Sequence, residues 1–117
     1  MTRMLASVAD DVEAGAVVQL GADIIDLKDA RRGALGAVTL DVARQAIAAV
    51  AGRSETSAAL GDPPYDEGAL LESARALAAM GIDYVKLAVD ASTVDRLGNS
   101  LGDPSVIFDA HAFRRAL

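Results

Sequence analysis

A repeated segment constrains the fold of this 117-residue chain more than any other feature. The stretches Gly-Ala-Asp-Ile-Ile-Asp, from Gly21, and Gly-Ile-Asp-Tyr-Val-Lys, from Gly81, share a frame and lie 60 positions apart. A βα unit of a parallel sheet takes about 30 residues, so this separation corresponds to two such units. The repeat therefore predicts parallel strands that are joined and covered by helices.

Hydrophobic periodicity places these elements along the chain. Apolar runs of strand length alternate with segments whose apolar residues recur at helical spacing. Thr39 is expected to cap the second helix, and a glycine follows each predicted helix and ends it. Strands are predicted over residues 4–8, 23–28, 55–60 and 82–89, and helices over about residues 11–20, 40–51 and 69–80.

The number of units predicts part of a barrel. Eight βα units close a TIM barrel of about 250 residues, and four are recognisable here. Residues 1–89 are therefore predicted to form the N-terminal half of an α/β, (β/α)8 TIM-barrel-type domain. The pattern weakens in residues 90–117, a divergent tail in which short helices are expected, the last one from Pro104 to Arg115.

Composition excludes several classes of partner. The chain has 17 Asp and Glu against 11 Lys and Arg, a formal net charge of −6. Surplus carboxylates repel phosphate backbones and anionic lipids, so neither nucleic-acid nor membrane binding is expected. With no cysteine and one histidine, His111, no metal site is expected. The chain starts with no signal-peptide pattern, which favours a cytoplasmic protein.

Three charged residues are predicted to share the interior of the barrel. Side chains alternate across a strand, so Asp26 and Lys28 lie opposite Ile25 and Leu27. Lys86, in the fourth predicted strand, likewise lies opposite an apolar face. The apolar faces are expected to pack against the outer helices. The charged set then points inward, toward the end of the strands where barrel enzymes have their active sites.

Two lysines in such a place favour amine chemistry. Desolvation destabilises a buried ammonium and a neighbouring cation adds to the cost, so a lysine of such a pair is readily neutral. A neutral amine can form a Schiff base with a carbonyl substrate. The second lysine would then move protons, and Asp26 would orient it or hold charge. The alternative is that each lysine is a solvated residue at the edge of a loop.

Other polar positions have simpler interpretations. Asp23 and Asp83 begin predicted strands and are expected to cap or brace the preceding turn. The segment Gly33-Ala34-Leu35-Gly36 could offer backbone amides to a phosphate, but it matches no phosphate-binding fingerprint. An ordinary glycine-containing loop is the favoured interpretation.

Five segments together carry a family resemblance: Met4–Val8, Gly21–Asp29, Gly33–Gly36, Ser57–Asp62 and Asp83–Lys86. They resemble the (5-formylfuran-3-yl)methyl phosphate synthase family of methanofuran biosynthesis. The resemblance implies a TIM-barrel lyase that condenses two molecules of glyceraldehyde 3-phosphate, with loss of one phosphate and water, into a furan aldehyde phosphate. It implies no metal and no organic cofactor, and the partner is a small phosphorylated aldehyde.

The resemblance also assigns roles to the three interior residues. Lys28 matches the lysine that forms the Schiff base, Lys86 matches the lysine that accepts a proton, and Asp26 matches an acidic residue beside the first lysine. The resemblance covers residues 4–89, and no counterpart of the second half of the family's barrel is recognisable. A truncated family member is therefore expected.

Two alternatives stay open beside the synthase. One is a non-catalytic half barrel that self-associates into a homo-oligomer, because an open half barrel exposes strand edges and an apolar face. The other is a different aldolase-type barrel enzyme that uses a Schiff base, since one fold supports many reactions.

Overall fold

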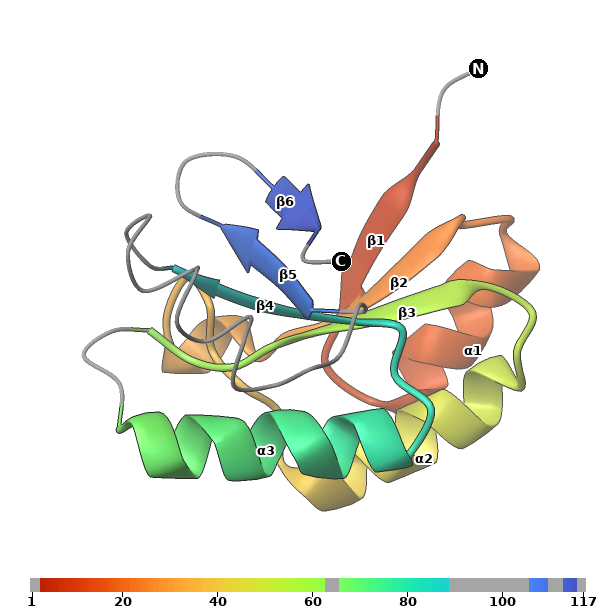
Figure 1. Ribbon diagram of the computed structural model, residues 1–117. Coiled ribbons are helices and arrows are strands. Elements are labelled where there is room, and N and C mark those ends of the chain that lie inside the picture. The colour runs from red at the N-terminus through yellow and green to blue at the C-terminus, as the bar shows by residue number, and fades with distance from the viewer. Residues whose placement is uncertain (1–2, 63–65, 89–105, 110–112, 116–117) are drawn as a thin grey trace.

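Six strands form one sheet in which the spatial order follows the chain order (Figure 1). The computed structural model describes residues 3–62, 66–88, 106–109 and 113–115. The strands are β1 (Leu5–Val8), β2 (Ile24–Leu27), β3 (Glu55–Ala59), β4 (Tyr84–Ala88), β5 (Val106–Asp109) and β6 (Phe113–Arg115). Strands β1 to β5 pair in parallel, and β6 pairs antiparallel with β5.

Three α-helices connect the first four strands and lie on one side of the sheet (Figure 1). They are α1 (Asp11–Gln19), α2 (Leu40–Val50) and α3 (Glu67–Ala79), and a short 3-10 helix, η1 (Ala30–Arg32), follows β2. Each α-helix begins after a side chain that accepts a hydrogen bond from the first turn, namely Asp10, Thr39 and Asp66. The predicted cap at Thr39 is therefore confirmed.

The core lies between these helices and one face of the sheet. Ile25 and Leu27 of β2 and Val85 and Leu87 of β4 are each at most 2% exposed. They pack with small and branched side chains of the helices, namely Ala14, Ala43, Ala46, Val50, Leu70, Ala74 and Leu77. The prediction that these apolar faces meet the helices is confirmed. The opposite face of the same strands is left for polar residues.

A tight turn precedes each of the strands β2, β3 and β4. Gly21, Gly52 and Gly81 occupy the same place in the three turns and all have positive φ, between 73° and 96°. The first and third belong to the repeat seen in the sequence. The structure shows a middle copy as well, Gly52-Arg53-Ser54, in which a serine stands where the other two copies have aspartate.

The seven predicted elements before residue 90 have bounds within two residues of those observed. The prediction for the tail is wrong where the structure describes it, because residues 106–109 and 113–115 are strands and not helix. Val106, Ile107 and Phe108 have high strand propensity, and β4 offers an edge for parallel pairing, so pairing outweighs the helical spacing. The rest of the tail, including His111, lies outside the described residues.

Within the described ranges, none of the helices has the length and apolarity that a membrane span requires.

Candidate active site

Asp26 is the centre of a polar network on the sheet face away from the helices. It is 0% exposed and lies on β2 between two serines in register with it, Ser7 of β1 and Ser57 of β3. Ser57 Oγ donates to Asp26 Oδ1 at 2.7 Å, and Ser7 Oγ donates to Asp26 Oδ2 at 3.2 Å. A buried carboxylate needs such donors, because its negative charge has lost its water.

Lys86 reaches the same carboxylate from β4. Its Nζ lies 2.9 Å from Asp26 Oδ2, and the lysine is 7% exposed. Strands β2 and β4 are about 10 Å apart because β3 runs between them, a gap that a lysine side chain can cross. The predicted juxtaposition of Asp26 and Lys86 is therefore present in the structure, as a buried ion pair.

Lys28 follows β2 directly and is half-buried. Its backbone N–H donates to Val8 O at 2.9 Å, which continues the ladder and keeps the alternation that places Lys28 on the face of Asp26. Its ammonium makes no ion pair or hydrogen bond with any residue that the structure describes. The sequence contains two lysines, and they differ: a carboxylate pairs with Lys86, whereas none in the described ranges pairs with Lys28.

The loops that follow β2 and β3 are tied together beside Lys28. Asp62, after β3, accepts hydrogen bonds from Leu35 N at 3.2 and 3.3 Å. Asp29 accepts a hydrogen bond from the Arg31 side chain at 3.1 Å, and this contact lowers the pKa of the Asp29 carboxyl below its usual value. Both contacts fix the course of the chain next to the candidate nucleophile.

In the glycine-containing segment from Gly33 to Gly36, three of the four backbone N–H groups are already hydrogen-bonded within the fold. The N–H groups of Gly33, Leu35 and Gly36 already donate to Ala30 O, Asp62 and Gly33 O. Gly33 has φ +121°, and a Cβ there would lie 2.0 Å from Asp62 Oδ2. Glycine is therefore required for the turn and for the approach of Asp62, which agrees with the simpler interpretation of the sequence.

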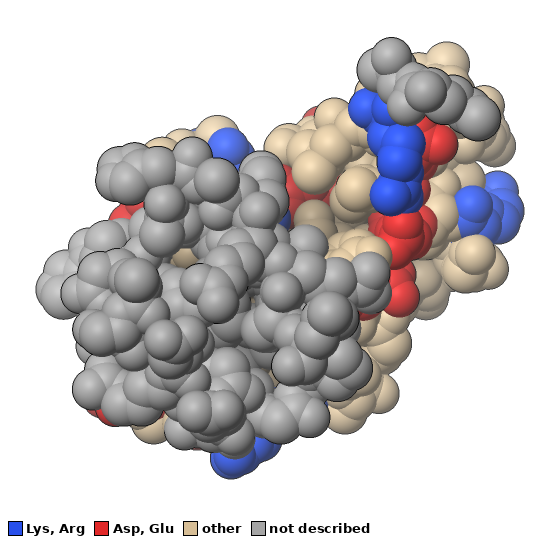
Figure 2. All heavy atoms as spheres, turned by 45° about the horizontal axis from the view of Figure 1, so that its top comes forward, with Lys and Arg blue, Asp and Glu red and all other residues tan. Residues whose placement is uncertain are grey.

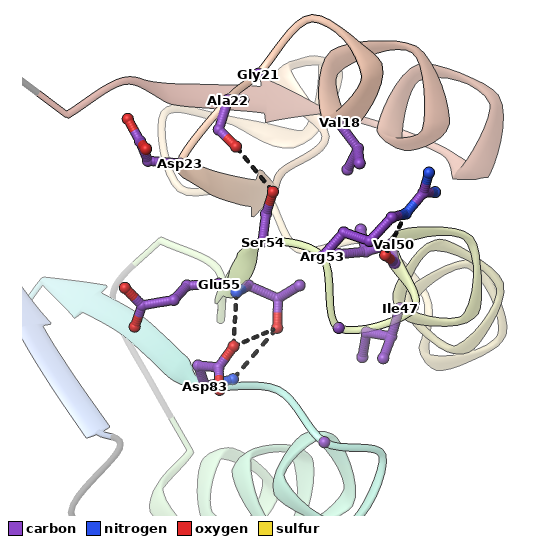
Figure 3. A pocket seen from close by; sticks show the side chains of 13 residues that line it. Val18, Gly21, Ala22, Asp23, Ile47, Val50, Arg53, Ser54, Glu55 and Asp83 are labelled. Carbon is purple, nitrogen blue, oxygen red and sulfur yellow. Dashed lines mark hydrogen bonds between the residues drawn. The ribbon is translucent and has the colours of Figure 1, made fainter.

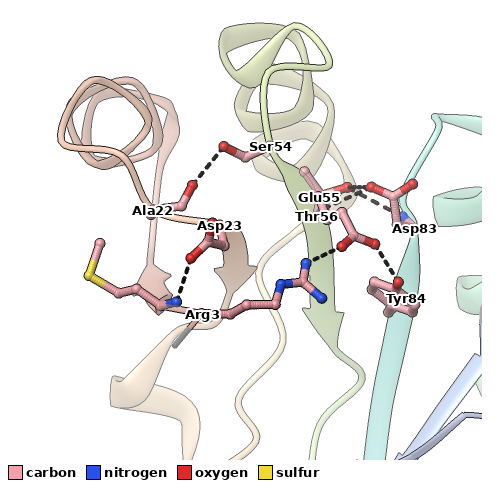
Figure 4. Close-up of polar contacts among 9 residues, drawn as sticks. Arg3, Ala22, Asp23, Ser54, Glu55, Thr56, Asp83 and Tyr84 are labelled. Atoms are coloured by element: carbon pink, nitrogen blue, oxygen red, sulfur yellow. Dashed lines mark hydrogen bonds and ion pairs between the residues drawn. The ribbon is translucent and has the colours of Figure 1, made fainter. Parts of the chain in front are cut away.

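The opposite end of the sheet contains a hollow of about 700 Å³, which the turns before β2, β3 and β4 surround (Figure 3). Asp23 accepts from Met4 N at 2.6 Å, and Asp83 accepts from Thr56 N at 2.8 Å (Figure 4). Ser54 Oγ donates to the carbonyl of the Ala22 residue at 2.8 Å. The predicted structural role of both aspartates is confirmed, although they brace the neighbouring strand segment and not the preceding turn.

A second polar group lies on the interior face at this amino end. The Glu55 carboxylate of β3 accepts hydrogen bonds from the Arg3 guanidinium and from the Tyr84 hydroxyl of β4 (Figure 4). On the face that Figure 2 shows, one basic group lies directly beside acidic atoms, and the other described basic atoms form small separate groups. The charge of Glu55 is thus paired within the fold.

Sequence reasoning missed the two serines of the Asp26 network. The missing signal is the middle copy of the repeat. The residue five positions after the turn glycine is Asp26 in the first copy, Ser57 in the middle copy and Lys86 in the last copy. One repeated position therefore supplies three members of the network, and Ser7 joins them through its register with Asp26.

Comparison with known proteins places the chain in a family. The profile of the family described as 4-HFC-P synthase matches residues 4–103. The chain belongs to this family. The family resemblance found in the sequence is confirmed, and the match extends past residue 89, where the sequence analysis ended it.

The relatives in this family are synthases of one furan phosphate. A Methylorubrum extorquens protein provisionally named (5-formylfuran-3-yl)methyl phosphate synthase is 42% identical over 87 residues, which are 74% of this chain and 36% of that protein. The (5-formylfuran-3-yl)methyl phosphate synthase of Methanopyrus kandleri is 39% identical over 85 residues, 73% of this chain and 36% of that protein. The chain thus spans little more than a third of the length of these relatives.

Solved structures share the fold at low sequence identity. PhdJ bound to a substrate intermediate superposes with a TM-score of 0.56 and 16% identity, over 91% of this chain and 42% of that one. A dihydrodipicolinate synthase from Agrobacterium tumefaciens gives a TM-score of 0.50 and 18% identity, over 86% of this chain and 41% of that one. Strands β1 to β4 and the three helices between them therefore have the arrangement found in TIM-barrel-like enzymes.

Proposed function

We propose that this chain carries the N-terminal part of the active site of a (5-formylfuran-3-yl)methyl phosphate synthase of methanofuran biosynthesis. In this proposal Lys28 is the nucleophile, Lys86 is the proton acceptor and Asp26 is the counter-ion of Lys86. The observation that carries the proposal is the buried 2.9 Å contact between Lys86 Nζ and Asp26 Oδ2, on the same sheet face as Lys28. Membership of the synthase family supports it.

The first step is the attack of the Lys28 amine on the aldehyde carbon of glyceraldehyde 3-phosphate. The nitrogen forms a bond to carbon, the aldehyde oxygen leaves as water, and a Schiff base results. Lys28 suits this role because no carboxylate of the described residues pairs with its nitrogen. A free electron pair on that nitrogen is what the attack requires.

The second step is removal of a proton from the carbon next to the Schiff base. Lys86 takes this proton in its neutral form, and the ammonium that results is the one that pairs with Asp26 at 2.9 Å. The electron pair of the broken C–H bond moves into the conjugated system and prepares the loss of phosphate.

The test of this function is reductive trapping with glyceraldehyde 3-phosphate and borohydride, followed by peptide mass spectrometry. Borohydride converts a Schiff base into a stable secondary amine, and only two lysines need to be mapped. The expected result is an adduct at Lys28 that Lys28→Ala abolishes and Lys86→Ala retains. A folded sample with no adduct under saturating substrate would overturn the proposal.

Two further arms of this experiment separate the alternatives. A panel of phosphorylated and unphosphorylated aldehydes distinguishes the furan phosphate synthase from another Schiff-base enzyme, because only the synthase is expected to prefer glyceraldehyde 3-phosphate. Sedimentation of the same sample shows whether the adduct-forming species is a homo-oligomer. A self-associated sample without adduct would support the non-catalytic half barrel.

A further inference from the structure

We infer that Ser57 is a positioning residue of this site, which orients the Asp26 carboxylate so that its second oxygen holds Lys86. The catalytic importance of this contact rests on the proposed function. The placement of Asp26 by Ser57 rests on the hydrogen bonds alone. Neither the sequence patterns nor the family resemblance assigned a role to Ser57.

The two carboxylate oxygens of Asp26 accept hydrogen bonds from different donors. Oδ1 accepts from Ser57 Oγ at 2.7 Å, and no other described residue donates to it. Oδ2 accepts from Lys86 Nζ at 2.9 Å and from Ser7 Oγ at 3.2 Å. Asp26 is 0% exposed and Ser57 is 2% exposed, so the short contact to Oδ1 is shielded from solvent.

Because of this asymmetry, Ser57 and Ser7 contribute differently to the orientation of the Asp26 carboxylate. A hydrogen bond on Oδ1 fixes the rotation of the carboxylate, and with it the direction in which Oδ2 points. Loss of Ser57 removes the one described donor to Oδ1, whereas loss of Ser7 leaves donors on both oxygens. Without that donor the carboxylate is free to rotate, and Oδ2 then no longer has to lie 2.9 Å from Lys86 Nζ. Ser57 therefore maintains the contact that distinguishes Lys86 from Lys28, whose nitrogen pairs with no carboxylate in the part of the chain that the structure describes.

The inference is tested by competitive acylation, which needs no substrate. The protein is labelled with a trace of acetic anhydride, and the acetylation of Lys86 relative to Lys28 is measured by peptide mass spectrometry. Ser57→Ala is expected to raise this ratio about tenfold, since a hydrogen bond to a charged group has roughly that effect on an equilibrium. Ser7→Ala is the matched control and should raise it about twofold or less. Ser57→Thr, which keeps the hydroxyl, should restore the ratio of the unmodified chain.

A double-mutant cycle separates positioning from general loosening of the fold. If Ser57 acts through Asp26, Ser57→Ala has no further effect on the ratio in an Asp26→Asn background. If it acts by loosening the sheet, the ratio rises again in that background and the inference is wrong. An unchanged or lowered ratio in Ser57→Ala alone also overturns it. Thermal melting of each variant establishes that the labelled chains are folded.

The acylation experiment and the trapping experiment test different claims, so each can succeed or fail without the other. An adduct at Lys28 with no effect of Ser57→Ala on acylation removes the role of Ser57 and keeps the proposed function. No adduct, together with the expected acylation ratios, removes the Schiff-base function and keeps the placement of Asp26 by Ser57. Where both succeed, Ser57→Ala should lower kcat of deuterium exchange at the substrate carbon and leave KM unchanged, because Lys28 is not altered.

Discussion

The two ends of the sheet use the same residue type for different purposes. Asp23 and Asp26 are three residues apart, one before β2 and one near its end. Asp23 accepts from a backbone N–H, that of Met4, whereas Asp26 accepts from two hydroxyls and an ammonium. The two aspartates therefore differ in the type of partner, and this difference is the reason that we propose a chemical role for Asp26 and not for Asp23.

The difference follows from what each donor can do. A backbone N–H belongs to the fold and keeps its proton, so a carboxylate bound to it can only hold the chain in place. An ammonium exchanges its proton with solvent and substrate, so its counter-ion affects reactivity. Barrel enzymes generally separate these tasks, with stability at the amino end of the strands and catalysis at the carboxyl end.

Asp26→Ala should produce the largest effect, because it leaves the 7% exposed Lys86 without its carboxylate. The expected loss is about 3 kcal/mol in the free energy of unfolding, as for other buried ion pairs that lose one partner. Urea denaturation measures it. The double variant Asp26→Leu with Lys86→Met should recover most of the stability, since no buried charge remains. A loss below about 1 kcal/mol in Asp26→Ala would show that the pair is open to solvent.

Asp83→Ala should cost about 2 kcal/mol, because Thr56 is 3% exposed and its N–H loses the 2.8 Å acceptor. The borohydride adduct at Lys28 should persist, since the substitution lies at the amino end. Asp83→Asn is the control, because its amide oxygen still accepts the hydrogen bond. Loss of the adduct in a folded Asp83→Ala protein would break the division between the two ends.

Two glycine substitutions compare the ends directly. Gly33→Ala should cost about 1.5 kcal/mol, because it strains a backbone at φ +121° and displaces Asp62 from Leu35. Gly52→Ala, at φ +73° and with open space for a Cβ, should cost about 1 kcal/mol from backbone strain alone. Thermal melting gives both values, and trapping gives the function. Only Gly33→Ala is expected to slow adduct formation, and equal trapping rates would show that the loop does not position Lys28.

The faces of the strands could be predicted because alternation along a strand is a local property. Ile25 and Leu27 had to lie opposite Asp26, whatever the strand paired with. The contact of Asp26 with Lys86 was expected from the same rule, together with the parallel order of β2, β3 and β4. The role of Ser57 was not predicted, because its strand Glu55–Ala59 has a weak pattern and the repeat was recognised in only two of its three copies.

The tail shows where local pattern fails. Residues 104–115 have a helical spacing, yet Val106–Asp109 pairs with β4. A strand edge offers a row of unpaired backbone groups, and their satisfaction outweighs a modest helical preference. No periodicity within the segment carries that information.

Composition, periodicity and the glycine repeat were sufficient for the α/β class, the bounds of seven elements and the face on which Asp26, Lys28 and Lys86 lie. These properties depend on neighbours within a few residues, and local sequence encodes them. Only the tertiary structure decided that Lys86 contacts Oδ2 of Asp26 while Ser57 donates to Oδ1, and that no described carboxylate pairs with Lys28. It also decided the partners of Asp23 and Asp83, which are Met4 N and Thr56 N. Each of these hydrogen bonds joins residues that are 19 to 60 positions apart in the sequence and about 3 Å apart in space. They therefore depend on the register between strands, which local sequence does not encode.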